Sequence, residues 1–183
     1  MKKLKEYELI KTEKFQLMLL LDEGEFDYYT NVYIELVVGM NKITIFKDNL
    51  LELRNNFKQL DAAIPMLDNR LEEAKLGILW NEYYKGLYED NSDESIIVDS
   101  EERWIGEKYC RFINTEYATW LYQYCGKIIM KVTPVFSGLE EDDYAQKYHR
   151  FLQKYKDIFR EELLPEQILC MKQIITDLYD KLI

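Results

Sequence analysis

Glycine and proline are scarce in this chain of 183 residues, which contains seven glycines and three prolines. Phosphate-binding loops need closely spaced glycines, because their backbone N–H groups must approach the phosphate oxygens. The glycines here are scattered along the chain and form no such cluster. A P-loop and a glycine-rich dinucleotide-binding turn are therefore excluded, and we expect short connections between helices and strands.

Cysteine and histidine are also rare. The three cysteines, Cys110, Cys125 and Cys170, lie far apart without a C-x-x-C pair, so neither a disulfide framework nor a zinc site is expected. The single histidine, His149, would have to serve any Ser–His–Asp or Cys–His catalytic site. It lies among charged residues of an expected helix, and we interpret it as a surface residue. We therefore expect no cofactor, no metal and a reducing compartment.

Long hydrophobic runs are missing as well. The densest run, residues 17–21, is five residues long. A membrane-spanning helix needs about 20 apolar residues, and a signal peptide needs about 7–15 with a cleavage site. We expect a protein that is neither exported nor embedded in a membrane, with the cytoplasm as the default location.

Positive charge is in deficit, because 24 basic residues face 34 acidic ones and leave a net charge of −10. Such a surface repels the phosphate backbone and anionic lipid, so direct binding of nucleic acid or membrane is disfavoured. A basic protein partner would be attracted and would associate faster. Acidity that serves solubility alone is the competing interpretation, and both stay open at this point.

The abundant residues are those of a folded core. Apolar residues make up 48% of the chain and aromatic residues 14%, whereas disordered chains are poor in aromatics. The length predicts a single domain over residues 1–183, large enough to fold without disulfides or metals.

Strand patterns dominate the first third of the chain. Residues 15–21 form a dense apolar run, and residues 31–38 are rich in β-branched and aromatic side chains. A short turn containing Gly39 leads to a further strand over residues 42–46, which predicts an antiparallel hairpin.

A second hairpin is expected over residues 117–132, with Cys125 and Gly126 as its turn. Trp120 and Tyr122 alternate with other residues on the outgoing strand. Apolar residues occur on both faces of the returning strand, which predicts a central position in the sheet. Pro134 ends the hairpin, because proline cannot donate to the ladder.

Helical periodicity follows the first hairpin. Asp48 or Asn49 can cap a helix whose apolar positions share one face. These positions are Leu50, Leu53, Phe57 and Leu60. A second helix is expected from Pro65 through Leu67, Leu71 and Ala74. Residues 78–88 are ambiguous, although Leu79, Tyr83 and Leu87 fit a helix, with Trp80, Tyr84 and Tyr88 on the neighbouring stripe.

The last third is predicted to be helical. One helix is expected from Tyr144 to Phe159, preceded by four acids that suit the positive end of its dipole. A final helix opens at Pro165 and carries an apolar stripe that ends at Leu182. Strands and helices do not alternate, so we predict an α+β fold. It consists of an antiparallel sheet with helices packed mainly on one face and a helical C-terminal third.

The run from Glu89 to Glu102 is the least globular part of the chain, with seven acids and no base. Residues 96–98 within it fit a brief strand. Asp90 and Glu101 have the spacing of the first and twelfth ligands of a calcium loop, but Ser95 stands where a glycine must make the sharp turn. We therefore interpret the run as a solvated acidic loop.

This acidic run is also the predicted partner-binding site. Self-repulsion among its acids would be relieved by a basic partner, and fifteen tyrosines and three tryptophans exceed the needs of one small core. Tyr and Trp are enriched at interfaces, because one end is apolar and the other can hydrogen-bond. The residues predicted to bind the partner are Asp90, Asp93, Glu94, Asp99, Glu101, Glu102 and Trp104.

The hairpin over residues 118–134 resembles one found in immunity proteins of bacterial polymorphic-toxin and contact-dependent inhibition systems. The shared pattern is a W-L-Y strand (Trp120 to Tyr122), a tight turn and an I-x-x-x-V-T-P strand (Ile128 to Pro134). The helix over residues 48–60 is similar too. The turn here is Cys-Gly rather than Asn-Gly or Asp-Gly. The resemblance implies a small, acidic, cytosolic protein that captures a toxin stoichiometrically, and it carries over no functional residue.

The function expected from the sequence is thus that of a non-enzymatic binding protein. Its partner would be a cognate, basic protein toxin such as a nuclease, whose active site it masks. Two alternatives from other classes remain: an enzyme with carboxylate chemistry and no familiar motif, and an acidic inhibitor that mimics nucleic acid.

Overall fold

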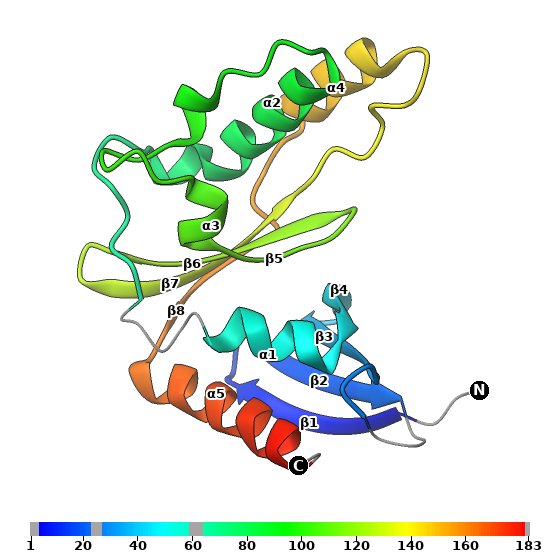
Figure 1. The fold of residues 1–183 in the computed structure, drawn as a ribbon, viewed down its shortest axis with the longest axis vertical. Helices are drawn as coiled ribbons and strands as arrows, with labels where there is room; N and C mark the ends of the chain where they lie inside the picture. The colour runs from blue at the N-terminus through cyan, green and yellow to red at the C-terminus, as the bar shows by residue number, and fades with distance from the viewer. Residues whose placement is uncertain (1–3, 23–26, 59–63, 182–183) are drawn as a thin grey trace. The chain divides into compact units, whose positions relative to one another are not determined.

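The computed structural model describes residues 4–22, 27–58 and 64–181 (Figure 1). The chain divides into two compact units, each with its own four-stranded sheet. Unit 1 comprises Met1–Ala63 with Leu163–Ile183, and unit 2 comprises Ile64–Glu162. The α+β class is confirmed, but the strands form two sheets rather than one. The single-domain organisation stays a prediction.

Unit 1 is an antiparallel meander covered by two helices. Its strands, in the spatial order of the chain, are β1 (Leu4–Lys11), β2 (Gln16–Asp22), β3 (Asn31–Val38) and β4 (Asn41–Asn49). Helix α1 (Leu50–Lys58) packs against β3 and β4, and helix α5 (Pro165–Asp180) packs against α1 and β1 (Figure 1). The predicted hairpin over residues 31–46 is confirmed as β3 and β4.

Local sequence signals set both helices of unit 1. The Asn49 side-chain oxygen accepts a hydrogen bond from the Glu52 backbone N–H at 2.9 Å, which confirms the predicted cap of α1. Helix α5 begins at Pro165, as predicted. The apolar stripes of the two helices are buried at Leu50, Leu53, Phe57, Ile168, Met171, Ile175 and Leu178. Leu60 and Leu182 lie outside the described residues.

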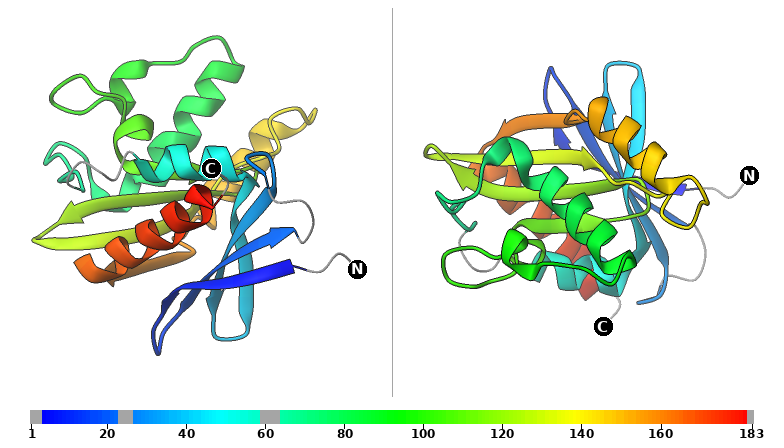
Figure 2. Two further views of the ribbon diagram at one scale, coloured as in Figure 1. Left: turned by 60° about the horizontal axis from the view of Figure 1, so that its bottom comes forward. Right: turned by 90° about the horizontal axis from the view of Figure 1, so that it is seen from above.

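Unit 2 has the strand order β5-β6-β7-β8. The strands are β5 (Cys110–Ile113), β6 (Tyr117–Tyr124), β7 (Lys127–Pro134) and β8 (Phe159–Leu163). The last residue of β8, Leu163, is also the first residue of the second segment of unit 1. The helices are the 3-10 turns η2 (Glu73–Lys75) and η3 (Glu94–Ile97), and α2 (Leu76–Tyr88), α3 (Ile105–Tyr109) and α4 (Tyr144–Gln153). Helix α4 lies beside α2, as two further views show (Figure 2).

The β6–β7 hairpin has the predicted place in the sheet. Its turn residues Cys125 and Gly126 have φ of 50° and 75°. This is the left-handed pair that a tight hairpin turn requires, and cysteine adopts it at some strain. Trp120 and Tyr122 are buried on one face of β6 and Leu121 on the other, and β6 pairs with β5 as well as β7. The central position is confirmed.

Three predictions of local structure in unit 2 are wrong. The segment after Pro65 is not a helix, because it runs along β6: Gln123 N–H donates to Pro65 O, and Leu67 N–H to Gln123 O, both at 2.8 Å. Helix α4 ends at Gln153, and the chain from Ile158 pairs with β7 instead. The expected strand over residues 96–98 is largely the 3-10 helix η3, and only Val98 makes a bridge, with Trp104.

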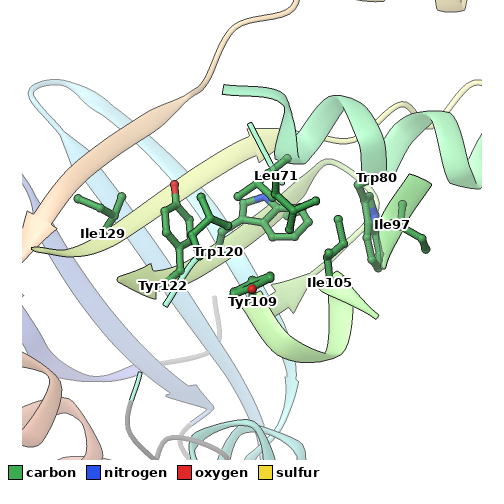
Figure 3. Packing of buried hydrophobic residues seen from close by; sticks show 11 residues of the cluster. Leu71, Trp80, Ile97, Ile105, Tyr109, Trp120, Tyr122 and Ile129 are labelled. Atoms are coloured by element: carbon green, nitrogen blue, oxygen red, sulfur yellow. The ribbon is translucent and has the colours of Figure 1, made fainter. Parts of the chain in front are cut away.

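The core of unit 2 lies between α2, α3 and one face of β6 (Figure 3). Trp80 comes from α2, Ile105 and Tyr109 from α3, and Trp120 and Tyr122 from β6. The Trp120 indole N–H donates to Thr133 Oγ1 at 2.9 Å, which satisfies its buried polar atom. This aromatic core fixes the position of α2 on the sheet.

Candidate functional site

Four aromatic side chains of unit 2, Tyr83, Tyr84, Tyr88 and Trp104, form what we call the aromatic face. Tyr84 and Trp104 are each 39% exposed and Tyr88 is 49% exposed. The Trp104 ring stacks on the buried Trp80 ring, with centroids 5.3 Å apart, and Tyr84 lies 5.0 Å from Trp80. The rings of Tyr84 and Trp104 are therefore backed by a core residue.

The sequence of α2 and α3 allows this arrangement. Residues 80, 84 and 88 lie one turn apart on α2 and so share one side of the helix. Gly106, in α3, lets the Trp80 ring approach closely, because a Cβ there would lie 2.3 Å from Trp80 Cζ3. Asn81 holds α2 to the end of β7: its amide donates to Pro134 O at 3.0 Å, and its oxygen accepts from Phe136 N–H at 2.6 Å.

Asp99 is the anchor of the acidic run 89–102, hereafter the acidic loop. Its side chain has no exposed surface. One carboxylate oxygen accepts hydrogen bonds from the N–H groups of Glu101 and Arg103 at 2.9 and 3.0 Å, and the other accepts from Lys108 Nζ. Burial alone raises the pKa of the Asp99 carboxyl, but the bonds from Lys108 and Arg103 outweigh it, so the net pKa lies below its ordinary value.

The prediction that Asp99 contacts a partner therefore needs correction. A carboxylate with no exposed surface cannot present its charge to another protein. Its bonds to two backbone N–H groups and to Lys108 hold the loop in shape instead.

Other acids of the loop are also paired within unit 2. Glu89 accepts from Lys85 Nζ at 2.6 Å and from the Tyr144 hydroxyl at 2.9 Å. Asp93 accepts from the backbone N–H and hydroxyl of Ser95 at 2.9 and 2.6 Å. Glu101 forms an ion pair with Arg103. Bases just outside the run thus neutralise part of the charge that the sequence concentrates there.

The remaining predicted residues lie on the loop surface. Asp90 and Glu102 are exposed and adopt left-handed φ values of 54° and 57°, at either end of the loop. Asp93 and Glu101 are exposed as well, whereas the Glu94 side chain lies outside the described structure. Trp104 follows the loop directly. The exposed acids and the aromatic face therefore belong to the same part of unit 2.

A second anchor ties the loop to the segment after Pro65. Asp68 accepts hydrogen bonds from the Ser100 hydroxyl and, at 2.9 Å, from the Ser100 backbone N–H. Together with a bond from the Arg70 N–H, these donors lower the pKa of Asp68 to about 2. No local sequence pattern indicates this contact, because Asp68 and Ser100 are far apart along the chain.

A groove of about 500 Å³ opens beside the aromatic face, between α2, the β5–β6 turn and the chain after β7. Glu140 is the only charged residue in the described part of its lining, so we call it the Glu140 groove. Its apolar lining consists of Tyr84, Tyr88, Ile113, Val135, Phe136 and Leu139. The tyrosine stripe was visible in the sequence, but the fold alone brings the other segments to it.

Unit 2 also buries a charge network around Lys131, a residue with no exposed surface. Its Nζ lies 3.0 Å from Asp157 Oδ2 and donates to the Glu73 backbone O at 2.7 Å. Glu73 in turn accepts from the Tyr122 hydroxyl at 2.6 Å and from Arg160 at 2.8 Å. Burial, and then the bond to Glu73, raises the pKa of Tyr122. The carboxylates of Asp157 and Glu73 are thus paired with Lys131 and Arg160. This pairing is typical of a structural network rather than of a reactive base.

The described parts of the chain hold no cluster of side chains suited to a metal ion. None of their helices is long and apolar enough to span a membrane. A cavity of about 590 Å³ between α1 and α5 has Arg54, Lys58 and Lys172 in its lining and no described carboxylate.

His149 and the cysteines also occupy ordinary positions. His149 is exposed on α4, as predicted, with its Nε2 3.0 Å from the Gln153 amide nitrogen. All three cysteines are free thiols. Burial raises the pKa of Cys110 to about 12, which opposes formation of the reactive thiolate.

Comparison with protein-family models, curated proteins and solved structures gave no significant match to this chain.

Proposed function

We propose that the protein is a non-enzymatic binding protein that recognises a basic protein partner through its aromatic face and the exposed acids of its acidic loop. The observation that carries the proposal is the exposed Trp104 ring stacked on the buried Trp80 ring. Interface hot spots are enriched in tryptophan and tyrosine. An anchor that is already fixed loses little conformational entropy on binding.

The acidic loop supports the same partner by its charge. The exposed acids Asp90, Asp93, Glu101 and Glu102 precede Trp104 in the sequence, and the chain has a net charge of −10. Exposed charges of this kind speed the association of a partner of opposite sign more than they hold the complex together. The aromatic face would then hold the complex, while the acids would bring the basic partner to it.

The specific form of this proposal is an immunity protein that neutralises a cognate bacterial toxin by stoichiometric capture. The resemblance of the hairpin to those of immunity proteins favours this form. A nuclease toxin fits the charge, because enzymes that act on nucleic acid present basic surfaces to it. The capture would mask the toxin's active site.

Neither of the two cavities described above favours carboxylate catalysis. Catalysis by two carboxylates requires both in one cleft with separated pKa values. The Glu140 groove is lined by one carboxylate, and the cavity between α1 and α5 by none among its described residues. A nucleic-acid mimic would need dense exposed charge, whereas Glu89, Asp99 and Glu101 are paired with bases of unit 2.

The test is co-expression with the product of the adjacent gene in the native genome. If that product arrests growth, the chain should restore growth and co-purify with it in a 1:1 complex. Trp104→Ala should weaken both effects. Tyr29→Ala is the matched control, because Tyr29 is a 72% exposed aromatic residue of unit 1. Protection of cells without a complex contradicts stoichiometric capture.

A further inference from the structure

The Glu140 groove has walls of aromatic rings that are each backed by another ring. Tyr84 lies 5.0 Å from Trp80, Tyr88 lies 5.4 Å from Tyr144, and Phe136 lies 5.2 Å from Tyr148, all between ring centroids. Such contacts restrict the rotation of the groove rings. The walls are therefore preorganised for a ligand that packs on aromatic faces.

The backbone around the groove is equally fixed. In the β5–β6 turn, the Asn114 side-chain oxygen accepts from the N–H groups of Glu116 and Tyr117, both at 2.8 Å. On the other side, Val135 N–H donates to Glu116 O at 2.8 Å, and Phe136 N–H donates to the buried Asn81. These bonds fix the groove at the β5–β6 turn and at the first residues of the chain after β7.

The lining indicates the chemistry of the occupant. Aromatic faces attract cations, and the carboxylate of Glu140 is the only charge among the described residues of the lining. Arginine suits both features, because its planar guanidinium stacks on rings and its fork of N–H groups matches a carboxylate. The volume of about 500 Å³ lies within the range of small-molecule sites, so the groove has room for an arginine side chain.

A partner could instead bind beside the groove by adding a strand to the edge of the sheet at β5, but the geometry of β5 disfavours this. Strand β5 borders the groove through Ile113 and lies first in the order of the described strands of its sheet. However, the register of β5 on β6 shifts between Cys110 and Phe112. Such a bulge twists an edge away from regular pairing. A side chain that enters the groove fits better than a strand that extends the sheet.

We propose that the Glu140 groove receives an arginine side chain of the protein partner, with the guanidinium against the tyrosine rings and paired with Glu140. This inference rests on the proposed function for the identity of the partner. Tyr84, which contacts Trp80, belongs both to the groove and to the aromatic face. The arginine would then bind beside the Trp104 anchor, in one continuous interface.

The test needs no partner protein. The full chain is titrated with acetyl-Gly-Arg-Gly-amide, and separately with the peptide in which neutral citrulline replaces arginine, while ring resonances are followed by NMR. The arginine peptide should shift the signals of Tyr84, Tyr88 and Phe136 and bind about tenfold more tightly than the citrulline peptide. Equal affinities, or shifts confined to other parts of the chain, overturn the proposal.

Matched variants locate the charge. Glu140→Gln should reduce the affinity for the arginine peptide to that for the citrulline peptide. Glu116→Gln, an exposed acid of the same region that does not line the groove, should leave it unchanged. If both variants behave alike, Glu140 has no specific role and the proposal fails. A second measurement separates the groove from the proposed interface. If the arginine peptide binds but Trp104→Ala leaves the affinity for the partner protein unchanged, the proposed interface is contradicted and the groove is not.

Discussion

Asp99 is an acid of the acidic loop that stabilises the conformation of the loop. The carboxylate is fully buried and accepts from Lys108 Nζ and two backbone N–H groups. A buried charge persists only where such donors replace water. At the scale of single residues, therefore, the composition of the loop gave the sign of its charge but not which acids face solvent.

Replacing Asp99 should destabilise the fold. We expect Asp99→Asn to lower the free energy of unfolding by about 2 kcal/mol, because the Lys108 ammonium loses its buried counter-charge. Urea unfolding measures the difference. Glu102→Gln, at an exposed position, is the control and should change it by less than about 0.5 kcal/mol. Equal effects of the two substitutions would mean that Asp99 is not an anchor.

Asp68 should make the free energy of unfolding depend on pH in the acidic range. Its hydrogen bonds from Ser100 and Arg70 lower its pKa to about 2, whereas an unfolded aspartate titrates near about 4. Because the folded pKa is the lower one, the stabilisation is complete above pH of about 4 and is lost as the pH falls towards about 2.

Asp68→Asn tests this pH dependence. The difference in unfolding free energy between the wild type and the variant should shrink as the pH falls from about 4 to about 2. Chemical unfolding at a series of pH values measures it. A difference that stays constant across this range contradicts the role of Asp68.

At the scale of elements, predictions that depend on neighbouring residues in the sequence were confirmed. The Asn49 cap, the Cys125-Gly126 turn and the stripe of α5 from Ile168 to Leu178 each follow from a local rule. Such signals act within a few residues, so the sequence displays them directly. The position of the acidic loop was visible for the same reason.

Elements that depend on distant partners were not predictable. The segment after Pro65 has helical spacing, but its backbone bonds to Gln123 of β6, and Phe159 has helical spacing but belongs to a strand beside β7. Periodicity does not reveal which backbone groups find partners elsewhere. The Glu140 groove was missed for this reason too, since α2, the β5–β6 turn and the chain after β7 meet only in the fold.

The acidic loop as an element should control the rate of association. Changing Asp93, Glu94, Glu101 and Glu102 together to their amides should lower the association rate with the cognate partner about tenfold at low salt and flatten its salt dependence. Asparagine at position 93 can keep the local cap on Ser95. Stopped-flow binding at two ionic strengths gives both quantities.

A charge-matched control distinguishes the effect of where the acids lie from the effect of the net charge of the chain. The same substitutions at Glu6, Glu13, Glu166 and Asp180 remove four exposed acids of unit 1. This control should slow association much less than the loop variant. If the two variants associate at the same rate, only the net charge of the chain matters and the loop is not part of the binding face.

At the scale of the whole molecule, hydrophobic cores carry the fold of both units. The cysteines are free, and no described cluster of side chains suits a metal. We therefore expect the midpoint of thermal unfolding to be the same with and without a strong chelator. A fall of many degrees would reveal a structural metal, and the calcium-like spacing from Asp90 to Glu101 would be the first place to look.

The binding kinetics of Trp104→Ala with the cognate partner decide whether Trp104 anchors a basic protein partner. We expect the dissociation rate to rise about 30-fold, which corresponds to about 2 kcal/mol at an interface hot spot, with the association rate changed less than about twofold. Tyr29→Ala should leave both rates at the wild-type values. A dissociation rate that is unchanged in a folded Trp104→Ala variant would contradict the proposed interface.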